Sequence, residues 1–328
     1  MIISRSPYRI TLGGGGTDIP SFYEKHGGYC ITMSIDNYMY ISLKPDELDN
    51  MCKLRYSEIE NVSSPELLRN TRAKEVLCKY NIRSVEINTC GDLPAKSGMG
   101  SSGTFLVGLL KTIREYKRMD TSPQVIAEEA CEIEIEKLGE PVGKQDQYIS
   151  SYGGIKILNI DKSGNVDTQD LNISKNDFSN FLSNIHVYSI GMQRSASDIL
   201  KEQSELSGNS EYLLNKIKEY GYKTKDIIES KNYDDYGVLL DEYWSIKKQL
   251  SNKISVSSVD KIYEELKNNF SVLGGKIIGA GGGGFFLVYC NSNITKLNNF
   301  MTLHGMKKLR FNVDYSGSKI IGNYLCKY

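Results

Sequence analysis

The chain has 328 residues, of which 40% are apolar and 24% are charged, a balance that is ordinary for a globular protein. The length exceeds that of one typical domain, so we expect two domains that share a cleft. Forty basic and forty acidic residues cancel, which leaves no overall field to attract nucleic acid or an anionic membrane. A general role in binding either partner is therefore disfavoured.

The cysteine, histidine and N-terminal patterns exclude further classes. The seven cysteines form no CxxC pair and the three histidines are far apart in the sequence, so we expect reduced thiols and no zinc site. The N-terminus carries no basic and apolar targeting pattern, and no stretch reaches the roughly 18 apolar residues of a membrane span. We expect a cytoplasmic protein with no membrane partner.

The first half of the chain begins as sheet and continues as helices. Three β-type runs, separated by turn-forming residues, occupy residues 29–35, 38–43 and 84–89. Apolar residues then recur at helical spacing from Ser101, and a second helical segment at 124–138 ends at Gly139. We expect these helices to pack on the sheet.

A polar stretch at residues 161–180 predicts the domain junction, so the two expected domains are residues 1–170 and 171–328. The second domain alternates strands with helices. Its elements are a strand at 185–190, charged helical segments between 196 and 270, a glycine-rich strand pair at 275–290, and a terminal helix and strand. The predicted fold class is α+β.

The segment LPAKSGMGSSGT, residues 93–104, joins a predicted strand to a predicted helix. Its glycines permit positive φ and close approach, so N–H groups can curl around a phosphate at the positive end of the helix. It is neither a Walker A sequence nor GxGxxG. A plain structural alternative is that Ser101 or Ser102 only caps the helix. The predicted phosphate-binding residues are Ser97, Gly98, Met99, Gly100, Ser101, Ser102 and Gly103.

The segment SPYRITLGGGGTDIPSF, residues 6–22, leads a strand into four consecutive glycines. A hairpin turn needs fewer glycines than this. Arg9 offers a permanent positive charge for a transferring phosphate or a developing alkoxide, and Asp18 offers acceptors for sugar hydroxyls. For either residue alone, a surface role explains the sequence equally well.

The segment EIEKLGEPVGKQDQY, residues 134–148, ends a helix at Gly139 and turns back towards Asp146. This reversal can bring Glu134 and Asp146 to the same cleft. Carboxylates beside a transferring phosphate hold Mg²⁺ or orient the attacking hydroxyl. For the neighbouring Glu132 and Glu136, we favour a solvated helix face.

The segment GGKIIGAGGGGFFLVY, residues 274–289, places four glycines, 281–284, between two apolar strands. A hairpin would need only about two such residues. Four glycines indicate that a ligand or another loop approaches the backbone closely. We expect this loop to close on the phosphate-binding segment.

These four segments, in this order, resemble those of the GHMP kinase family, whose members include galactokinase, homoserine kinase, mevalonate kinase and phosphomevalonate kinase. The resemblance covers nearly the whole chain. It implies a ribosomal protein S5 domain 2-like N-terminal domain that binds ATP and a ferredoxin-like C-terminal domain. It also implies ATP and Mg²⁺ as cofactors.

The resemblance further implies a role for each motif residue. Asp146 matches the catalytic aspartate, and Arg9 takes the place of a basic partner beside the reacting hydroxyl. Ser102 and Glu134 match the magnesium ligands, and Asp18 resembles a sugar-hydroxyl ligand. The other expected substrate contacts are Gly15, Gly16, Gly282 and Gly283.

The pattern from Glu134 to Gln147 is like that of galactokinases, which implies phosphorylation of an anomeric sugar hydroxyl. Galactokinases carry Glu-His where this chain has Gly15 and Gly16. The string GGGGTD with GKQDQY is instead similar to the branch that converts D-glycero-D-manno-heptose 7-phosphate to the 1,7-bisphosphate for nucleotide-activated heptose and surface glycans. A phosphorylated acceptor needs a basic contact, for which Lys144 and Arg194 are the candidates.

Three alternatives stay open. L-fucokinase-like and galactokinase-like enzymes share much of the pattern, so an unphosphorylated sugar is a second candidate acceptor. A sugar and ATP sensor of the same fold is another, although intact Asp146, Ser102 and Glu134 disfavour it. An RNA-binding module is disfavoured by the neutral charge. We expect a monomer or homodimer.

Overall fold

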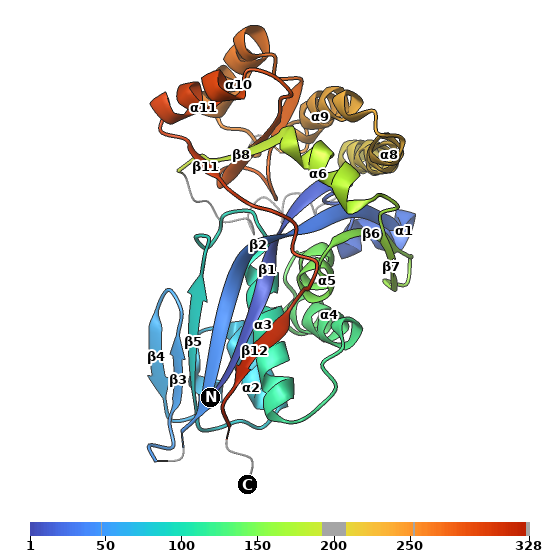
Figure 1. Ribbon diagram of the computed structural model, residues 1–328. Helices are drawn as coiled ribbons and strands as arrows, with labels where there is room; N and C mark the ends of the chain where they lie inside the picture. The colour runs from blue at the N-terminus through green and yellow to red at the C-terminus, as the bar shows by residue number, and fades with distance from the viewer. Residues whose placement is uncertain (47, 192–207, 252, 326–328) are drawn as a thin grey trace.

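Two long antiparallel strands, β1 and β2, organise the first of two sheets (Figure 1). The sheet has the order β12-β1-β2-β5-β3-β4, and β6 and β7 extend it from the other end of β2. Its strands are β1 (Ile2–Gly13), β2 (Gly28–Pro45), β3 (Cys52–Arg55), β4 (Ile59–Val62), β5 (Val85–Gly91), β6 (Ile155–Ile160), β7 (Val166–Asp170) and β12 (Lys319–Asn323). The computed structural model describes residues 1–46, 48–191, 208–251 and 253–325.

Strand β2 corrects the prediction of separate strands at 29–35 and 38–43. It is continuous, but its pairing with β1 shifts so that Tyr8 lies opposite Ile35 and Pro7 opposite Tyr38. The two turn-forming residues between Ile35 and Tyr38 thus lack β1 partners, as in a β-bulge. A bulge lets one strand continue through a turn-like sequence.

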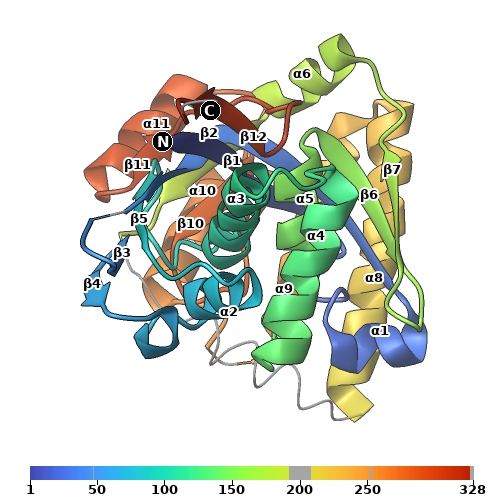
Figure 2. The ribbon, with the colours of Figure 1, turned by 90° about the horizontal axis from the view of Figure 1, so that it is seen from below.

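Helices cover one face of this sheet (Figures 1 and 2). The apolar stripe predicted from Ser101 lies on α3, where Leu106 and Leu110 pack with Ile41 and Leu43 of β2. This burial fixes the position of the start of α3. The helices are α1 (Pro20–His26), η1 (Pro65–Leu67), α2 (Thr71–Lys79), α3 (Ser101–Tyr116), α4 (Pro123–Cys131), the π-helix η2 (Glu132–Lys137) and α5 (Gln145–Tyr152).

The second sheet is antiparallel, with the order β11-β8-β10-β9. Taken in chain order, this is the strand order of a ferredoxin-like domain. Residues of β10 alternate, so that Phe286 packs among α10 and α11 while Leu287 belongs to a core shared with β1. The elements are α6 (Lys175–Ser183), β8 (Ile185–Ser189), α8 (Gly208–Ser230), α9 (Tyr233–Lys247), α10 (Ser257–Phe270), β9 (Gly274–Ile277), β10 (Phe285–Tyr289), α11 (Ile294–Leu303) and β11 (Lys307–Leu309).

We call the first sheet and its helices the N-terminal lobe, and the second sheet and its helices the C-terminal lobe. The division at residue 170 stays a prediction, although β7 ends at Asp170 and the second sheet begins with β8. The last strand does not follow this division, because β12 pairs with β1 in the N-terminal lobe. The two-domain α+β fold is confirmed.

The two lobes meet through glycine backbone. A Cβ atom on Gly98 would lie 2.5 Å from the Ile278 carbonyl oxygen, and one on Gly284 would lie 2.1 Å from the Ser97 carbonyl oxygen. No side chain fits at either position. The expected closure of the third glycine-rich segment on the phosphate-binding segment is therefore what the structure shows.

The six cysteines in the described part of the chain are free, as expected. His186 is buried with Nε2 next to the Cys290 carbonyl oxygen, and burial lowers the pKa of His186 to about 4. His186 therefore lies in the interior, away from the cavity described below. Among the described residues, no helix has both the length and the apolar character required to cross a membrane.

We predict that Gly284→Ala destabilises the protein by about 2–5 kcal/mol. The residue has a φ of 84°, which costs an L-residue about 1–2 kcal/mol, and the added methyl group overpacks against Ser97. Gly305→Ala is the matched control, because Gly305 has a φ of 75° and open space around its Cβ position. Urea unfolding measures both. Equal losses would contradict the proposed lobe contact.

Candidate active site

A cavity of about 300 Å³ is lined by residues of both lobes. The segments at residues 6–22, 93–104 and 134–148, with Arg72 of α2, line one side. Residues of α9 and β9, and those that follow each element, line the other. The lining residues are Arg9, Thr11, Gly15, Gly16, Asp18, Ile19, Arg72, Lys96, Gly98, Gly100, Ser101, Ser102, Glu140, Val142, Gly143, Gln145, Asp146, Tyr243, Lys247, Leu250, Lys276, Gly279 and Ala280. The cavity thus brings together segments that are far apart in the sequence.

The start of α3 presents unpaired donors to this cavity. Gly100, in the left-handed conformation, is the N-cap residue and no side chain caps the helix, so the capping alternative for Ser101 and Ser102 is wrong. The hydroxyls of Ser97 and Ser101 are buried and have no hydrogen-bond partner. Free N–H groups and hydroxyls at the positive end of a 16-residue helix suit an anion.

The seven predicted phosphate-loop residues divide into two groups. Gly98, Gly100, Ser101 and Ser102 line the cavity. The remaining three, Ser97, Met99 and Gly103, do not: Met99 lies in the core, and Gly103 packs against Asp146, whose Cβ would be 2.7 Å from a Cβ added to that glycine. The second group supports the loop.

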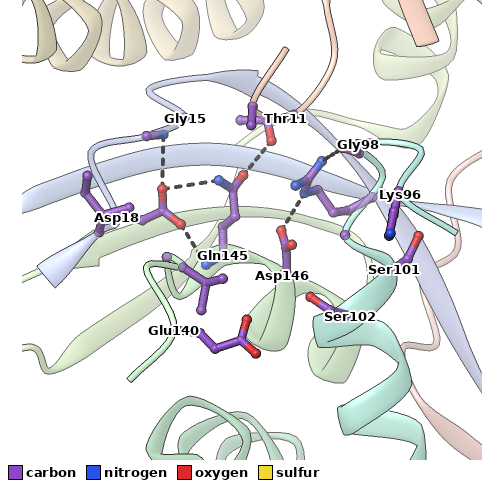
Figure 3. A pocket seen from close by; sticks show the side chains of 18 of the residues that line it. Thr11, Gly15, Asp18, Lys96, Gly98, Ser101, Ser102, Glu140, Gln145 and Asp146 are labelled. Atoms are coloured by element: carbon purple, nitrogen blue, oxygen red, sulfur yellow. Dashed lines mark hydrogen bonds and ion pairs between the residues drawn. The ribbon is translucent and has the colours of Figure 1, made fainter. Parts of the chain in front are cut away.

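Asp146 and Arg9 form an ion pair at the start of α3 (Figure 3). Arg9 Nε donates to Asp146 Oδ1 at 2.7 Å, and Arg9 Nη1 donates to the Gly98 carbonyl oxygen at 2.6 Å. A Cβ added to Gly100 would lie 3.0 Å from Asp146 Cγ. The carboxylate therefore lies directly beside the loop that would hold phosphates.

Asp18 is almost completely buried and is held by Gln145 (Figure 3). Its Oδ1 accepts from Gly16 N at 3.1 Å and Gln145 Nε2 at 3.2 Å, and its Oδ2 accepts from Gln145 N at 3.1 Å. Burial raises the pKa of Asp18, the charge of Asp146 adds to this, and the backbone hydrogen bonds oppose it. Asp18 thus shapes the glycine loop containing Gly15 and Gly16.

Glu134 is fully buried and does not line the cavity. Its Oε1 accepts from Arg72 Nε at 2.7 Å and its Oε2 accepts from Gln147 Nε2 at 2.5 Å. Burial raises the pKa of Glu134 although Arg72 opposes this. Arg72 also pairs with Glu140 at 2.7 Å, so it bridges the buried carboxylate to a carboxylate of the cavity wall.

The predicted magnesium ligands are thus only partly suited to the ion as they stand. Ser102 faces the cavity, whereas both carboxylate oxygens of Glu134 accept hydrogen bonds within the protein. Among the described residues, no group of three or more His, Cys, Asp or Glu side chains is arranged to hold a metal. Mg²⁺ is commonly bound by one or two carboxylates with substrate phosphates and water, and of the two predicted ligands only the hydroxyl residue Ser102 lies on the cavity wall.

Three of the remaining predicted substrate contacts lie away from the cavity wall. Lys144 Nζ donates to the Gly164 carbonyl oxygen and lies 5.2 Å from the Tyr23 ring centroid, and Lys144 does not line the cavity. Gly282 and Gly283 also lie off the cavity wall, where Gly279 and Ala280 stand instead. Arg194 lies outside the described residues.

Several polar residues that line the cavity are not among the predicted site residues: Thr11, Arg72, Lys96, Glu140, Gln145, Tyr243, Lys247 and Lys276. Lys276 lies within the third glycine-rich segment and Gln145 precedes Asp146, so both had a local signal. Lys247 and Arg72 had none, because each lies in a charged helical segment that resembles a solvated surface.

The fold and the site define the class of a small-molecule kinase, and comparison with known proteins agrees. Residues 68–154 match the GHMP kinases N terminal domain. The crystal structure of a D-glycero-D-manno-heptose 1-phosphate kinase from Bacteroides thetaiotaomicron superposes with a TM-score of 0.80 at 20% identity, over 99% of this chain and 100% of that one. Structural similarity at 20% sequence identity supports the fold and not the substrate.

Two curated relatives extend the match beyond that domain. D-glycero-alpha-D-manno-heptose 7-phosphate kinase of Campylobacter jejuni is 28% identical over 88% of this chain and 89% of its own length. The bifunctional fucokinase/GDP-fucose pyrophosphorylase of Arabidopsis thaliana is 25% identical over 86% of this chain but only 29% of its own length. The prediction of a phosphotransferase with an alcohol acceptor is confirmed, and the resemblance to GHMP kinases is confirmed for the matched N-terminal domain.

We predict that Arg72→Ala destabilises the protein by about 2–4 kcal/mol, because it leaves the carboxylate of Glu134 buried without its charge partner. The same change raises the pKa of Glu134 further. Arg55→Ala is the control, because Arg55 is 55% exposed and lies 3.9 Å from Glu86, a surface pair whose loss costs about 0–1 kcal/mol. Urea unfolding at pH 7 gives both values. Equal losses in the free energy of unfolding would mean that the Arg72–Glu134 pair stabilises the protein no more than a surface ion pair does.

Proposed function

We propose that the chain is an ATP-dependent sugar kinase that phosphorylates the anomeric hydroxyl of D-glycero-D-manno-heptose 7-phosphate, giving the 1,7-bisphosphate for nucleotide-activated heptose and surface glycans. The observation that carries the proposal is the Arg9–Asp146 pair beside the uncapped start of α3, in one cavity. A phosphate-binding helix end and a carboxylate for a hydroxyl proton are the two parts that phosphoryl transfer requires.

In this proposal, Ser101, Ser102 and the adjacent N–H groups bind the triphosphate. The anomeric oxygen attacks the γ-phosphorus, the bond from that phosphorus to the β–γ bridging oxygen breaks, and ADP leaves. Asp146 accepts the hydroxyl proton, while Arg9 keeps the carboxylate oriented through its 2.7 Å bond. Because the transition state is loose, alignment and charge neutralisation supply most of the catalysis.

Mg²⁺ enters the proposal as the ion that accompanies ATP and neutralises its phosphate charge. Ser102 is the side chain that would hold it on the cavity wall. Glu134 is buried behind the cavity wall, where it accepts hydrogen bonds from Arg72 and Gln147. Arg72 lines the cavity, and phosphate oxygens are good partners for a guanidinium.

The acceptor assignment rests on the relatives and on the glycine loop. The heptose 7-phosphate kinase matches over nearly its whole length, whereas the fucokinase matches over less than a third of its own. Gly15 and Gly16 leave the wall beside Asp18 without side chains, which favours a large acceptor over galactose. An L-fucokinase-like or galactokinase-like activity is the alternative. ATP is available in the cytoplasm, so we also propose a cytoplasmic location.

We predict that Asp146→Asn lowers kcat by about 10²- to 10⁴-fold, the usual contribution of a general base, and leaves the Kd of ATP within about threefold. Coupled ADP release with heptose 7-phosphate gives kcat, and calorimetry with a non-hydrolysable ATP analogue gives Kd. The control is Asp167→Asn, because Asp167 is exposed on β7 and bonds only to Gln169 among the described contacts.

The same assay separates the proposal from its alternatives. Turnover with galactose or L-fucose but not with heptose 7-phosphate would keep the kinase and replace the acceptor. Binding of ATP and sugar without any ADP release would favour the sensor. Full activity of Asp146→Asn would remove Asp146 from the mechanism.

A further inference from the structure

Two lysines line the cavity on the C-terminal lobe and have no acidic partner among the described residues. Lys247, at the end of α9, is 6% exposed, and Lys276, on β9, is 2% exposed. Lys247 Nζ donates to the Gly279 carbonyl oxygen at 2.5 Å, and Lys276 Nζ donates to the Leu12 carbonyl oxygen at 3.2 Å. Each ammonium has three donors, so both keep donors for a ligand.

Burial disfavours the charged form of both lysines. Burial lowers the pKa of Lys247 to about 7, and the positive charge of Arg9 adds to this effect. Burial lowers the pKa of Lys276 well below its usual range, with Lys247 and Arg9 contributing. Burial therefore favours the neutral amines, and a ligand of opposite charge would favour the charged ammonium forms. Lysines of this kind at a cavity wall mark a functional site.

Tyr243 connects the two lysines to the predicted sugar-binding loop. Its ring centroid lies 4.6 Å from Lys276 Nζ and 5.9 Å from Lys247 Nζ. Its hydroxyl donates to the Gly15 carbonyl oxygen at 3.5 Å. The lysines and Tyr243 therefore form one wall of the space beside the glycine loop.

The other basic side chains of the cavity already have tasks. Arg9 pairs with Asp146, Arg72 bridges two glutamates, and Lys96 belongs to the phosphate loop. Lys247 and Lys276 are therefore the basic side chains of the cavity, among the described residues, that have no carboxylate partner and lie outside the phosphate loop.

We propose that Lys247 and Lys276 form an anion subsite that binds the phosphate group of a phosphorylated acceptor sugar. This inference rests on the proposed sugar kinase function and names the groups that select its substrate class. Two ammonium groups match the double charge of a phosphate monoester. Lys144, one of the two contacts expected from the sequence, does not line the cavity, and Arg194, the other, lies outside the described residues.

The test uses Lys247→Met and Lys276→Met, which keep the length of the side chain and remove the charge. ADP release is measured with D-glycero-D-manno-heptose 7-phosphate and with the same heptose lacking phosphate. Each variant should raise the KM for heptose 7-phosphate by about 10- to 100-fold, the range for losing a charge-assisted hydrogen bond. The KM for ATP and kcat/KM for the unphosphorylated heptose should change less than about threefold.

Lys248→Met is the matched control, because Lys248 follows Lys247 but pairs with Asp260 at 3.6 Å. It should leave every constant unchanged. Thermal unfolding checks that the variants fold. Since methionine suits a buried site better than an unpaired ammonium, the midpoint should not fall for Lys247→Met or Lys276→Met.

Several outcomes would overturn the subsite. A parallel rise in KM for ATP, or an equal loss on both heptoses, would assign the lysines to the nucleotide. An unchanged KM for heptose 7-phosphate, or a wild-type enzyme that acts only on unphosphorylated sugars, would also refute it while leaving the kinase intact.

If the wild-type protein shows no turnover, the proposed function fails and binding decides the subsite separately. Calorimetry with heptose 7-phosphate would then compare wild type with Lys247→Met. Binding lost only in the variant supports the subsite. Equal binding, or no binding to wild type, overturns it.

Discussion

The contact between two glycine-rich loops, one from each lobe, is the constraint on which the site depends. A Cβ on Gly98 or on Gly279 would lie 2.5 Å from a carbonyl oxygen of the opposite loop. The lobes therefore meet backbone to backbone at this point, and the cavity opens beside it. Since Arg9 bonds both to the Gly98 carbonyl oxygen and to Asp146, the same loop position sets the place of the Asp146 carboxylate.

The glycine-rich loops could be predicted from the sequence because glycine marks positions where the local backbone turns or is approached closely. Asp146 could be predicted because it follows the turn after Gly139. Four consecutive glycines indicate close approach to the backbone, and a glycine-rich loop between a strand and a helix is typical of phosphate binding. Lys247 could not be predicted in this way. Its segment alternates acidic, basic and apolar residues like a solvated helix, and only the packing of α9 on β9 through Gly237 and Gly274 buries it.

Glu134 illustrates a third case, in which the motif predicts the residue but not its contacts. Glutamates stand at positions 132, 134 and 136, and the sequence singles out Glu134 for the site while favouring a solvated face for the other two. The π-helix η2 places the Glu134 side chain in the interior and leaves Glu136 exposed. π-turns often occur at functional sites. Arg72, the ion-pair partner of Glu134, lies on α2, 62 residues earlier in the chain. No local sequence pattern predicts this pairing.

Charge shows why whole-chain composition says little about such a site. The chain has no net charge, yet among the described residues the cavity is lined by five basic side chains and three acidic ones. The acidic side chains are Asp18, Glu140 and Asp146, and the basic ones are Arg9, Arg72, Lys96, Lys247 and Lys276. Arg9 and Arg72 are balanced by carboxylates, whereas Lys247 and Lys276 are not. Two cavity lysines without carboxylate partners are what the proposed anion subsite requires, and the net charge of the whole chain does not reveal them.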